Sequence, residues 1–156
     1  MFEDFPIYSN GTKPGTLQRI ILSGASHGGW LALVTALRHP GLIAGVVATC
    51  PIVDLSSYLA TELGHKHRVE FPANPQHMDP ATLLNSVNPI HLELLLVASE
   101  KDSIVQNQDL DSFCTHWKDI AGPVTLLRHE GGHYTPPSDE IEALEKQLLK
   151  FVTGQG

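Results

Sequence analysis

The sequence predicts an α/β fold in three layers, with helices on both faces of a mostly parallel β-sheet. Short apolar runs rich in Ile, Val and Leu alternate along the chain with longer segments whose apolar residues recur at helical spacing. The runs are nearly continuous, as in strands that are covered on both faces. The length fits one domain, so we treat residues 1–156 as a single unit.

The first part of the chain predicts a lead-in followed by a strand, a helix and a second strand. Residues 1–18 carry several Pro and Gly and few apolar side chains, so a loop is expected there. A buried strand is predicted over 19–23, and a helix rich in Leu and Ala over 31–39, where Pro-Gly follows. The apolar run 42–50 predicts the second strand, which a proline ends.

Residues 55–89 differ from the rest of the chain because they are polar and contain four prolines. We expect this segment to be an excursion that lies over the end of the sheet. Short helices are predicted over 56–63 and 79–85. Asp79 suits the N-cap of the second helix, since its carboxylate can accept from the backbone while Pro80 takes the first helical position.

The last part predicts two further strands and two helices. The strands are expected over 94–99 and 124–128, and a helix over 107–120 lies between them. A final helix follows Pro136-Pro137. Its predicted inward stripe consists of Ile141, Leu144, Leu148, Phe151 and Val152. Right-handed crossovers would make all four strands parallel.

The segment Gly24-Ala25-Ser26-His27-Gly28 lies between the first strand and the first helix, and it has the pattern G-x-S-x-G. In a strand-turn-helix setting this pattern is a nucleophile elbow, a tight turn that presents one serine hydroxyl over the end of a sheet. Side chains at the glycine positions would collide with the turn, the helix or an incoming substrate. The pattern therefore makes Ser26 a candidate nucleophile.

A serine hydroxyl is a weak nucleophile at neutral pH, so Ser26 would need a base and a group that orients the base. Asp102 follows the strand 94–99, and His133 follows the strand 124–128 after two glycines. Carboxyl ends of parallel strands meet at one edge of a sheet, so these three side chains are expected to lie together. Their order along the chain, Ser then Asp then His, is that of a known hydrolase arrangement.

Other residues compete for the two supporting roles. Asp54, Glu100 and Asp109 are alternatives for the acid, and His129 is an alternative for the base because it lies nearer to the strand. The glycine pair before His133 gives the backbone freedom to turn that histidine toward Ser26, which favours His133. Asp102 is favoured by its place in the turn that follows the third strand.

Three stretches of the sequence resemble the α/β-hydrolase superfamily, and in particular the prolyl oligopeptidase-like catalytic domain of peptidase family S9. They are G-A-S-H-G-G-W, L-L-L-V-A-S-E-K-D-S-I-V and H-E-G-G-H-Y. The resemblance covers residues 17–152. It implies that Ser26 is the nucleophile, that His133 is the general base and then acid, and that Asp102 orients it. It also implies that the backbone N–H of His27 is one oxyanion donor.

The resemblance covers only the C-terminal half of such a domain. Members of the superfamily normally begin with about four more strands, and a domain of this type needs roughly 200 residues. The absent half would carry the loop that supplies a second oxyanion donor, and loss of one donor typically costs on the order of 100-fold in rate. The first strand would then lie at an open edge of the sheet, where it could pair with another chain.

Composition excludes several other classes of function. With 42% apolar and 17% charged residues the chain is globular, and a formal charge of −7 argues against binding to nucleic acid. No apolar stretch is long enough to span a membrane, and the acidic start lacks the features of a signal peptide. Two cysteines, Cys50 and Cys114, predict a reducing, cytoplasmic location rather than a disulfide framework.

The histidines do not follow the spacing of a metal site, so we expect neither a metal nor a cofactor. His65 and His67 lie in a polar stretch and are expected to be solvated. Trp30 and Tyr134 are candidates to border a substrate pocket, with packing and an ordinary loop role as their alternatives.

These observations give three hypotheses about function. The first is a serine hydrolase that works through an acyl-enzyme, with peptides as the substrates that the family resemblance implies. The second is a hydrolase of small carboxylic esters. The third is a truncated hydrolase half of weak or no activity, which acts as a binding module or pairs through its exposed first strand.

Overall fold

The computed structural model describes residues 19–68, 71, 75–88, 90–133 and 135–154. The predicted loop over residues 1–18 lies outside the described residues. A four-stranded sheet forms the middle layer, with its strands in the order β1-β2-β3-β4. The strands are β1 (Ile21–Ala25), β2 (Gly45–Thr49), β3 (Glu93–Ser99) and β4 (Val124–His129). All three pairings are parallel, as the sequence predicts.

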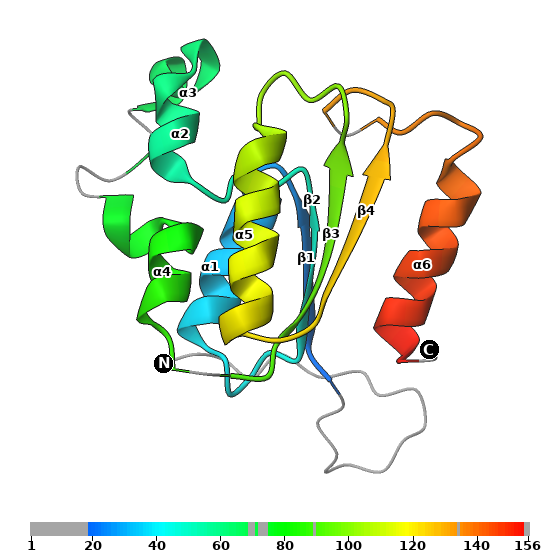
Figure 1. Cartoon of the computed structure of the whole chain (residues 1–156), viewed down its shortest axis with the longest axis horizontal. Coiled ribbons are helices and arrows are strands. Elements are labelled where there is room, and N and C mark those ends of the chain that lie inside the picture. Colours follow the sequence, from blue (N-terminus) through cyan, green and yellow to red (C-terminus); the bar gives the residue numbers. More distant parts are fainter. Residues whose placement is uncertain (1–18, 69–70, 72–74, 89, 134, 155–156) are drawn as a thin grey trace, which may run out of the picture.

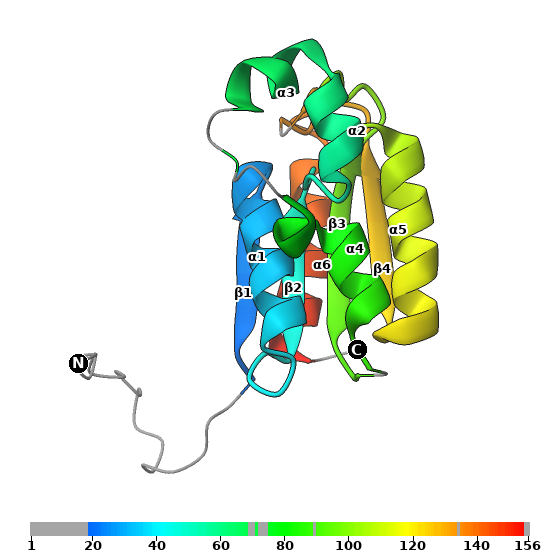
Figure 2. The ribbon, with the colours of Figure 1, turned by 90° about the vertical axis from the view of Figure 1, so that its left-hand side faces the viewer.

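Helices cover both faces of this sheet (Figures 1 and 2). One layer consists of α1 (His27–Arg38), α4 (Pro80–Ser86) and α5 (Asn107–Ile120), and α6 (Ile141–Thr153) lies on the opposite face. The strands follow one another across the sheet in a single direction, so right-handed crossovers place the connecting helices on one side. The three-layer α/β/α architecture is therefore confirmed.

The segment between β2 and β3 contains α2 (Leu55–Ala60), α3 (Glu62–His67) and the 3-10 helix η2 (Pro75–Met78) before it reaches α4. Figure 1 shows α2 and α3 beyond the carboxyl ends of the strands, whereas α4 lies beside α1 and α5. The segment thus begins above the sheet and then returns along its helical layer.

The side chain of Asp79 joins the two parts of this segment. Its Oδ2 accepts from the backbone N–H of Thr82 at 2.9 Å, which caps α4 as predicted. Its Oδ1 accepts from the N–H of Leu55 at 2.9 Å, at the first residue of α2. One buried carboxylate therefore holds the beginnings of two helices together.

The hydrophobic core lies between the sheet and the layer of α1, α4 and α5. Its fully buried members include Leu33, Val46, Leu84, Leu94, Leu96, Leu110 and Trp117. The indole Nε1 of Trp117 donates to the carbonyl oxygen of Leu92 at 2.9 Å, so the largest core side chain has its polar atom satisfied. In the part of the chain that the structure describes, no helix combines the length and the apolar character that a membrane crossing requires.

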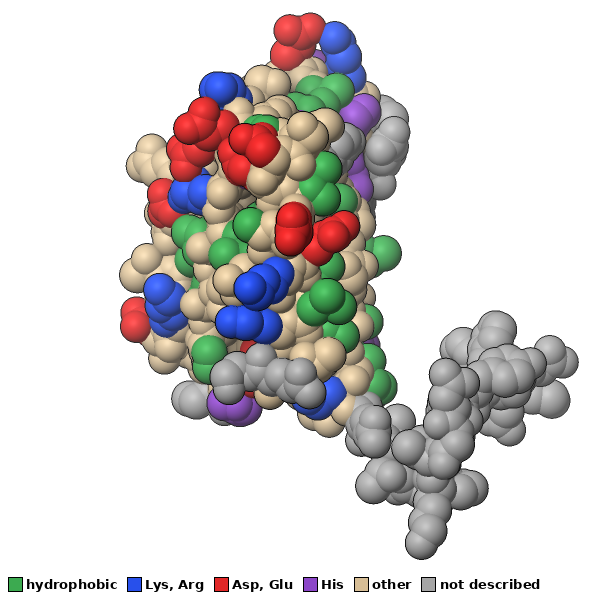
Figure 3. Space-filling view, turned by 90° about the vertical axis from the view of Figure 1, so that its right-hand side faces the viewer, with side chains coloured by type: hydrophobic (Ala, Val, Ile, Leu, Met, Phe, Trp, Pro, Cys, Tyr) green, Lys and Arg blue, Asp and Glu red, His purple; other side chains and the backbone are tan. Residues whose placement is uncertain are grey.

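The packing of α6 differs from the prediction. None of its described residues is buried, and Ile141 and Val152 of the predicted inward stripe remain 41% and 48% exposed. Leu149, outside that stripe, is 63% exposed. Within the described residues no second helix lies beside α6 on its face of the sheet, so its apolar side chains have few neighbours. Figure 3 shows this side of the molecule, where apolar side chains lie between charged ones.

Some element boundaries also differ. α1 begins at His27, directly after the elbow serine, whereas the composition of the segment predicted a start at residue 31. Gly28 and Gly29 have a low helix propensity, yet they lie in the first turn of α1. β2 begins at Gly45 instead of residue 42, and Leu42 stays exposed in the preceding turn.

Candidate active site

Ser26 lies at the tight turn between β1 and α1, where the sequence predicted a nucleophile elbow. Its backbone has φ 51° and ψ −115°, a conformation that residues other than glycine rarely adopt. The turn is held from both sides: the N–H of Ser26 donates to the carbonyl of Thr49 at 2.8 Å, and its carbonyl accepts from Trp30 at 2.9 Å. Such strain is typical of residues that the surrounding structure holds for a function.

The glycines of the elbow have different roles. A Cβ on Gly24 would lie 2.2 Å from the carbonyl oxygen of Gly28, and a Cβ on Gly29 would lie 2.9 Å from the Cβ of Pro51. Both positions therefore require glycine for close approach, as the sequence predicted for Gly24 but not for Gly29. A Cβ on Gly28 would meet no atom within 4 Å, so the described chain imposes no such requirement there.

The structure brings Ser26, His133 and Asp102 into one chain of hydrogen bonds. Nδ1 of His133 lies 2.7 Å from Oδ2 and 2.8 Å from Oδ1 of Asp102. Nε2 of the same ring lies 3.0 Å from Oγ of Ser26. A carboxylate can only accept, so Nδ1 carries the proton of a neutral ring and Nε2 accepts from the serine hydroxyl. This arrangement can take a proton from Ser26 when Oγ attacks an electrophile.

Asp102 is fixed by its own turn. Its side chain is 0% exposed, and Oδ1 accepts from the N–H groups of Ile104 at 2.8 Å and Val105 at 2.9 Å. Burial raises the pKa of Asp102, but the hydrogen bonds from His133, Val105 and Ile104 outweigh it, so the pKa is lowered overall. The carboxylate thus stays ionised and can orient the imidazole.

The loop that carries His133 is held by contacts rather than by unusual backbone angles. Oγ of Ser99, at the end of β3, donates to the carbonyl of Gly131, and Nδ1 of His129 accepts from the N–H of Gly131 at 3.1 Å. A Cβ on Gly131 would lie 1.8 Å from the carbonyl oxygen of Thr135, while one on Gly132 would meet nothing. The prediction that both glycines supply backbone freedom is therefore wrong: Gly131 is needed for close approach, and neither has a positive φ.

The alternative residues have other partners. Asp54 caps α2 by accepting from the N–H of Ser57 at 2.8 Å, and Asp109 accepts from the hydroxyl of that same serine at 2.6 Å. Glu100 lies 3.7 Å from the guanidinium of Arg128. His129 is buried and makes the contact with Gly131 described above. None of the four contacts Ser26 in the described structure.

A cluster of aromatic rings lies next to Ser26 and was not predicted. The His27 ring stacks on Phe71 with centroids 5.8 Å apart, and it packs edge-on against Tyr58 at 5.7 Å. The Tyr58 hydroxyl lies 2.9 Å from Nδ1 of His67, which is half-buried. The expectation of a solvated His67 is therefore wrong, because α3 places its ring 5.6 Å from the ring of His27, next to the elbow serine.

Trp30 belongs to the packing around this cluster. Its indole Nε1 donates to the carbonyl of Met78 at 2.7 Å, and its ring lies edge-on to Phe71 at 5.3 Å. It therefore joins α1 to the segment before α4. Tyr134, the other candidate for the pocket, lies outside the described residues.

The sequence as a whole matches one known protein family. The model described as the prolyl oligopeptidase family matches residues 13–155, nearly the whole chain. The chain belongs to the prolyl oligopeptidase family. This confirms the resemblance that the three sequence stretches indicated. No curated protein matches the sequence.

Solved structures similar to this member of the prolyl oligopeptidase family include both esterases and peptidases. The esterase Pf2001 from Pyrococcus furiosus has 22% identity and a TM-score of 0.65, with 86% of this chain and 53% of the esterase covered. The dipeptidyl peptidase 4 of Porphyromonas gingivalis has 19% identity and a TM-score of 0.67, with 86% and 19% covered. An S-formylglutathione hydrolase from Agrobacterium tumefaciens has 22% identity and a TM-score of 0.61, with 83% and 46% covered.

These similarities show an α/β-hydrolase fold. The chain spans about half the length of the Pyrococcus furiosus esterase and about a fifth of the Porphyromonas gingivalis peptidase. The first strand of the described sheet is the elbow strand β1.

Proposed function

We propose that the chain carries the catalytic residues of a serine hydrolase that works through an acyl-enzyme at Ser26. The observation that carries this proposal is the chain of hydrogen bonds from Ser26 Oγ through His133 to the buried carboxylate of Asp102. Membership of the prolyl oligopeptidase family and the strained backbone of Ser26 support it independently.

In the proposed reaction, Oγ of Ser26 attacks the carbonyl carbon of the substrate while Nε2 of His133 takes the hydroxyl proton. The tetrahedral intermediate collapses when His133 gives this proton to the leaving amine or alcohol, and an ester to Ser26 remains. Water then attacks this ester with the same histidine as base, which regenerates the serine. Asp102 stays ionised throughout and stabilises the imidazolium.

The negative oxygen of the intermediate needs hydrogen-bond donors. His27 is the first residue of α1, so its backbone N–H lies at the positive end of the helix dipole, next to the nucleophile. We assign one oxyanion donor to this N–H. Loss of a second donor would cost on the order of 100-fold in rate. For this reason we expect weak activity if no other segment or partner supplies one.

Peptides are the proposed substrates, and carboxylic esters are the alternative. The family match supports peptides, while the similar esterase structures keep esters as a second candidate.

Hydrolysis of matched chromogenic substrates tests this proposal. An acyl-peptide nitroanilide and a nitrophenyl ester of the same acyl group should both be cleaved, and Ser26→Ala should abolish both activities. Ser23→Ala is a matched control, because Ser23 is an exposed serine of β1 that directly precedes the G-x-S-x-G motif. A folded chain that cleaves the ester alone would favour the esterase, and activity that survives Ser26→Ala would contradict the proposal.

The second candidate function is self-association through β1. This strand forms one edge of the described sheet, and Ile20 beside it is 39% exposed. The carbonyl of Ile20 accepts from Ala44, and the N–H of Ser26 donates to Thr49, so both groups face β2. Backbone groups of successive residues in a strand point to alternate sides, so the N–H and C=O groups of Ile21 and Ser23 point away from β2. Outward groups on an edge strand can pair with a second copy of the chain.

Sizing chromatography of wild type and Ser23→Pro tests this candidate. Proline removes an outward N–H and leaves the ladder to β2 intact, so it should convert a dimer to a monomer. A wild-type chain that elutes as a folded monomer across a concentration series would contradict pairing through β1.

A further inference from the structure

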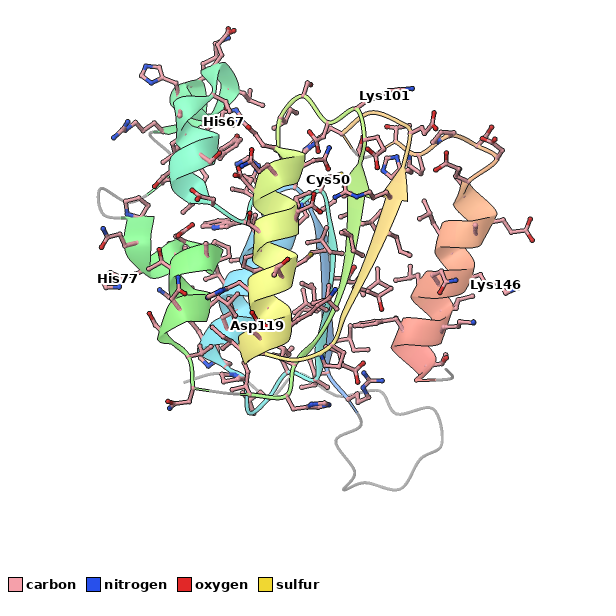
Figure 4. All side chains as sticks on the ribbon, in the orientation of Figure 1. Cys50, His67, His77, Lys101, Asp119 and Lys146 are labelled. Carbon is pink, nitrogen blue, oxygen red and sulfur yellow. The ribbon has the colours of Figure 1, made fainter. Side chains whose placement is uncertain are left out.

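Cys50 lies beside the proposed catalytic acid and base, although the proposed reaction does not use it. It follows β2 directly, at the same sheet end as the turn after β3 and the loop after β4 (Figure 4). One ligand atom each from Cys50, Asp102 and His133 lies within 4.8 Å of the others. The three neighbouring strands thus bring a sulfur, a carboxylate oxygen and an imidazole nitrogen together.

The surroundings of Cys50 hold its side chain in this place. The residue is fully buried, its φ is 43°, and its N–H donates to the carbonyl of Val97 at 2.7 Å. Burial, with a further contribution from the negative charge of Asp102, raises the pKa of the Cys50 thiol to about 12. A cation bound to the sulfur would lie next to the negative charge of Asp102, whose carboxylate belongs to the same cluster.

We propose that Cys50, Asp102 and His133 form a binding site for a thiophilic divalent cation such as Zn²⁺, which reversibly inhibits the enzyme. Thiolate, imidazole and carboxylate are the three ligand types that Zn²⁺ takes in proteins, and a water molecule can complete a tetrahedron. Binding releases the Cys50 proton to solvent and forms a Zn–S bond. Asp102 exchanges its hydrogen bond to His133 for a bond to the metal.

The inhibition follows from the two nitrogens of His133. Nδ1 faces Asp102 and Nε2 faces Ser26. A metal on Nδ1 takes the lone pair there, so the ring proton moves to Nε2. Nε2 can then no longer accept the proton of the Ser26 hydroxyl, and the serine is not activated. This consequence rests on the proposed hydrolase function, whereas the metal site itself does not.

The path of entry is narrow. The side chain of Asp102 is 0% exposed and that of His133 is 9% exposed, and Cys50 is fully buried, so little of the cluster faces solvent. We therefore expect inhibition to develop slowly after mixing, and to reverse with a chelator.

Direct metal binding is measured first, with Co²⁺ as a spectroscopic substitute for Zn²⁺ on the full chain. We expect a near-ultraviolet thiolate-to-Co²⁺ charge-transfer band that Zn²⁺ or EDTA removes. Cys50→Ser should abolish the band, and Cys114→Ser should retain it, because Cys114 is buried in α5 outside the cluster. A folded wild-type chain without the band, or a band that persists in Cys50→Ser, would overturn the proposal.

Inhibition is measured second, from the rate at which a fluorophosphonate probe labels the protein. For each protein, the rate in the presence of Zn²⁺ is compared with the rate of the same protein in EDTA. Removal of one ligand should raise the Zn²⁺ concentration for half-inhibition by at least about tenfold in Cys50→Ser. Equal sensitivity of Cys50→Ser and wild type to Zn²⁺ would contradict the inhibitory site.

If Cys50→Ser does not fold, Cys50→Ala replaces it. If wild type is not labelled even in EDTA, the hydrolase proposal fails and the Co²⁺ titration alone decides the metal site.

Discussion

A Cβ on Gly24 would lie 2.2 Å from the carbonyl oxygen of Gly28, so the elbow can close only while position 24 has no side chain. The atoms in the way belong to the backbone and cannot rotate aside. We expect Gly24→Ala to lower the free energy of unfolding by roughly 2 kcal/mol or more, which urea denaturation would measure. The same variant should lose labelling of Ser26, because the turn that presents the hydroxyl would open.

Gly28→Ala is the matched control for this prediction. A Cβ at that position meets no atom within 4 Å, and alanine favours the first turn of α1. Its free energy of unfolding should stay within about 0.5 kcal/mol of wild type or rise slightly. Equal losses in the two variants would show that the close approach between positions 24 and 28 does not determine the fold of the elbow.

The loop before His133 allows a second paired test. A Cβ on Gly131 would overlap the carbonyl oxygen of Thr135, whereas Gly132 has open space. We expect Gly131→Ala to displace the loop and to slow fluorophosphonate labelling by at least about 100-fold, since a small misplacement of a base is costly. Gly132→Ala should label at nearly the wild-type rate. Similar rates for both variants would contradict a positioning role for Gly131.

The lowered pKa of Asp102 predicts how stability depends on pH. Its pKa in the folded chain lies below the ordinary value of 3.8, so the folded state binds this proton less readily than the unfolded state does. The stabilisation is present above the unfolded pKa and is lost as the pH falls through the folded pKa. Urea unfolding between about pH 3 and pH 7 should therefore show a shallower loss of stability in acid for Asp102→Asn than for wild type.

Asp119→Asn is the control for the pH experiment, because Asp119 is exposed on α5 far from the site (Figure 4). It should keep the wild-type pH dependence. If the stability of Asp102→Asn depended on pH in the same way as that of wild type and Asp119→Asn, the carboxylate of Asp102 would not gain its hydrogen bonds on folding.

The hydrogen bonds of Asp79 predict an effect on the free energy of unfolding that does not involve the candidate active site. Asp79→Ala removes the cap of α4 and leaves the N–H of Leu55 without its acceptor. The cap is worth about 1 kcal/mol and the buried N–H about 1 kcal/mol or more, so the loss should be about 2 kcal/mol in urea unfolding. Asp54→Ala removes a single cap, to Ser57, and should cost less. The reverse order of the two losses would contradict the bridging role of Asp79.

The parallel direction of the strands and the meeting of Ser26, Asp102 and His133 could be predicted from the sequence, because each residue lies in the turn or loop that follows a strand. Parallel strands place all such residues at one edge, whatever the details of the packing. His133 Nε2 and Ser26 Oγ are thus within 3.0 Å although 107 positions separate them in the chain.

Other features depend on tertiary contacts that no local pattern records. Cys50 lies beside Asp102 because of the register of β2 against β3, in which Thr49 pairs with Val97. His67 is covered because α2 and α3 fold over the elbow. The exposure of α6 depends on which elements surround it, whereas its helical periodicity depends on its own sequence alone. Periodicity therefore predicted the helix but not its burial.

Fluorophosphonate labelling of the purified chain, followed by mass spectrometry of its peptides, tests the central claim most directly. We predict one adduct, on the peptide that contains Ser26, with labelling abolished in Ser26→Ala and strongly reduced in His133→Ala. Circular dichroism of each protein would show that it is folded. A folded wild-type chain that remains unlabelled, or that carries its adduct on another residue, would contradict the assignment of Ser26 as the nucleophile.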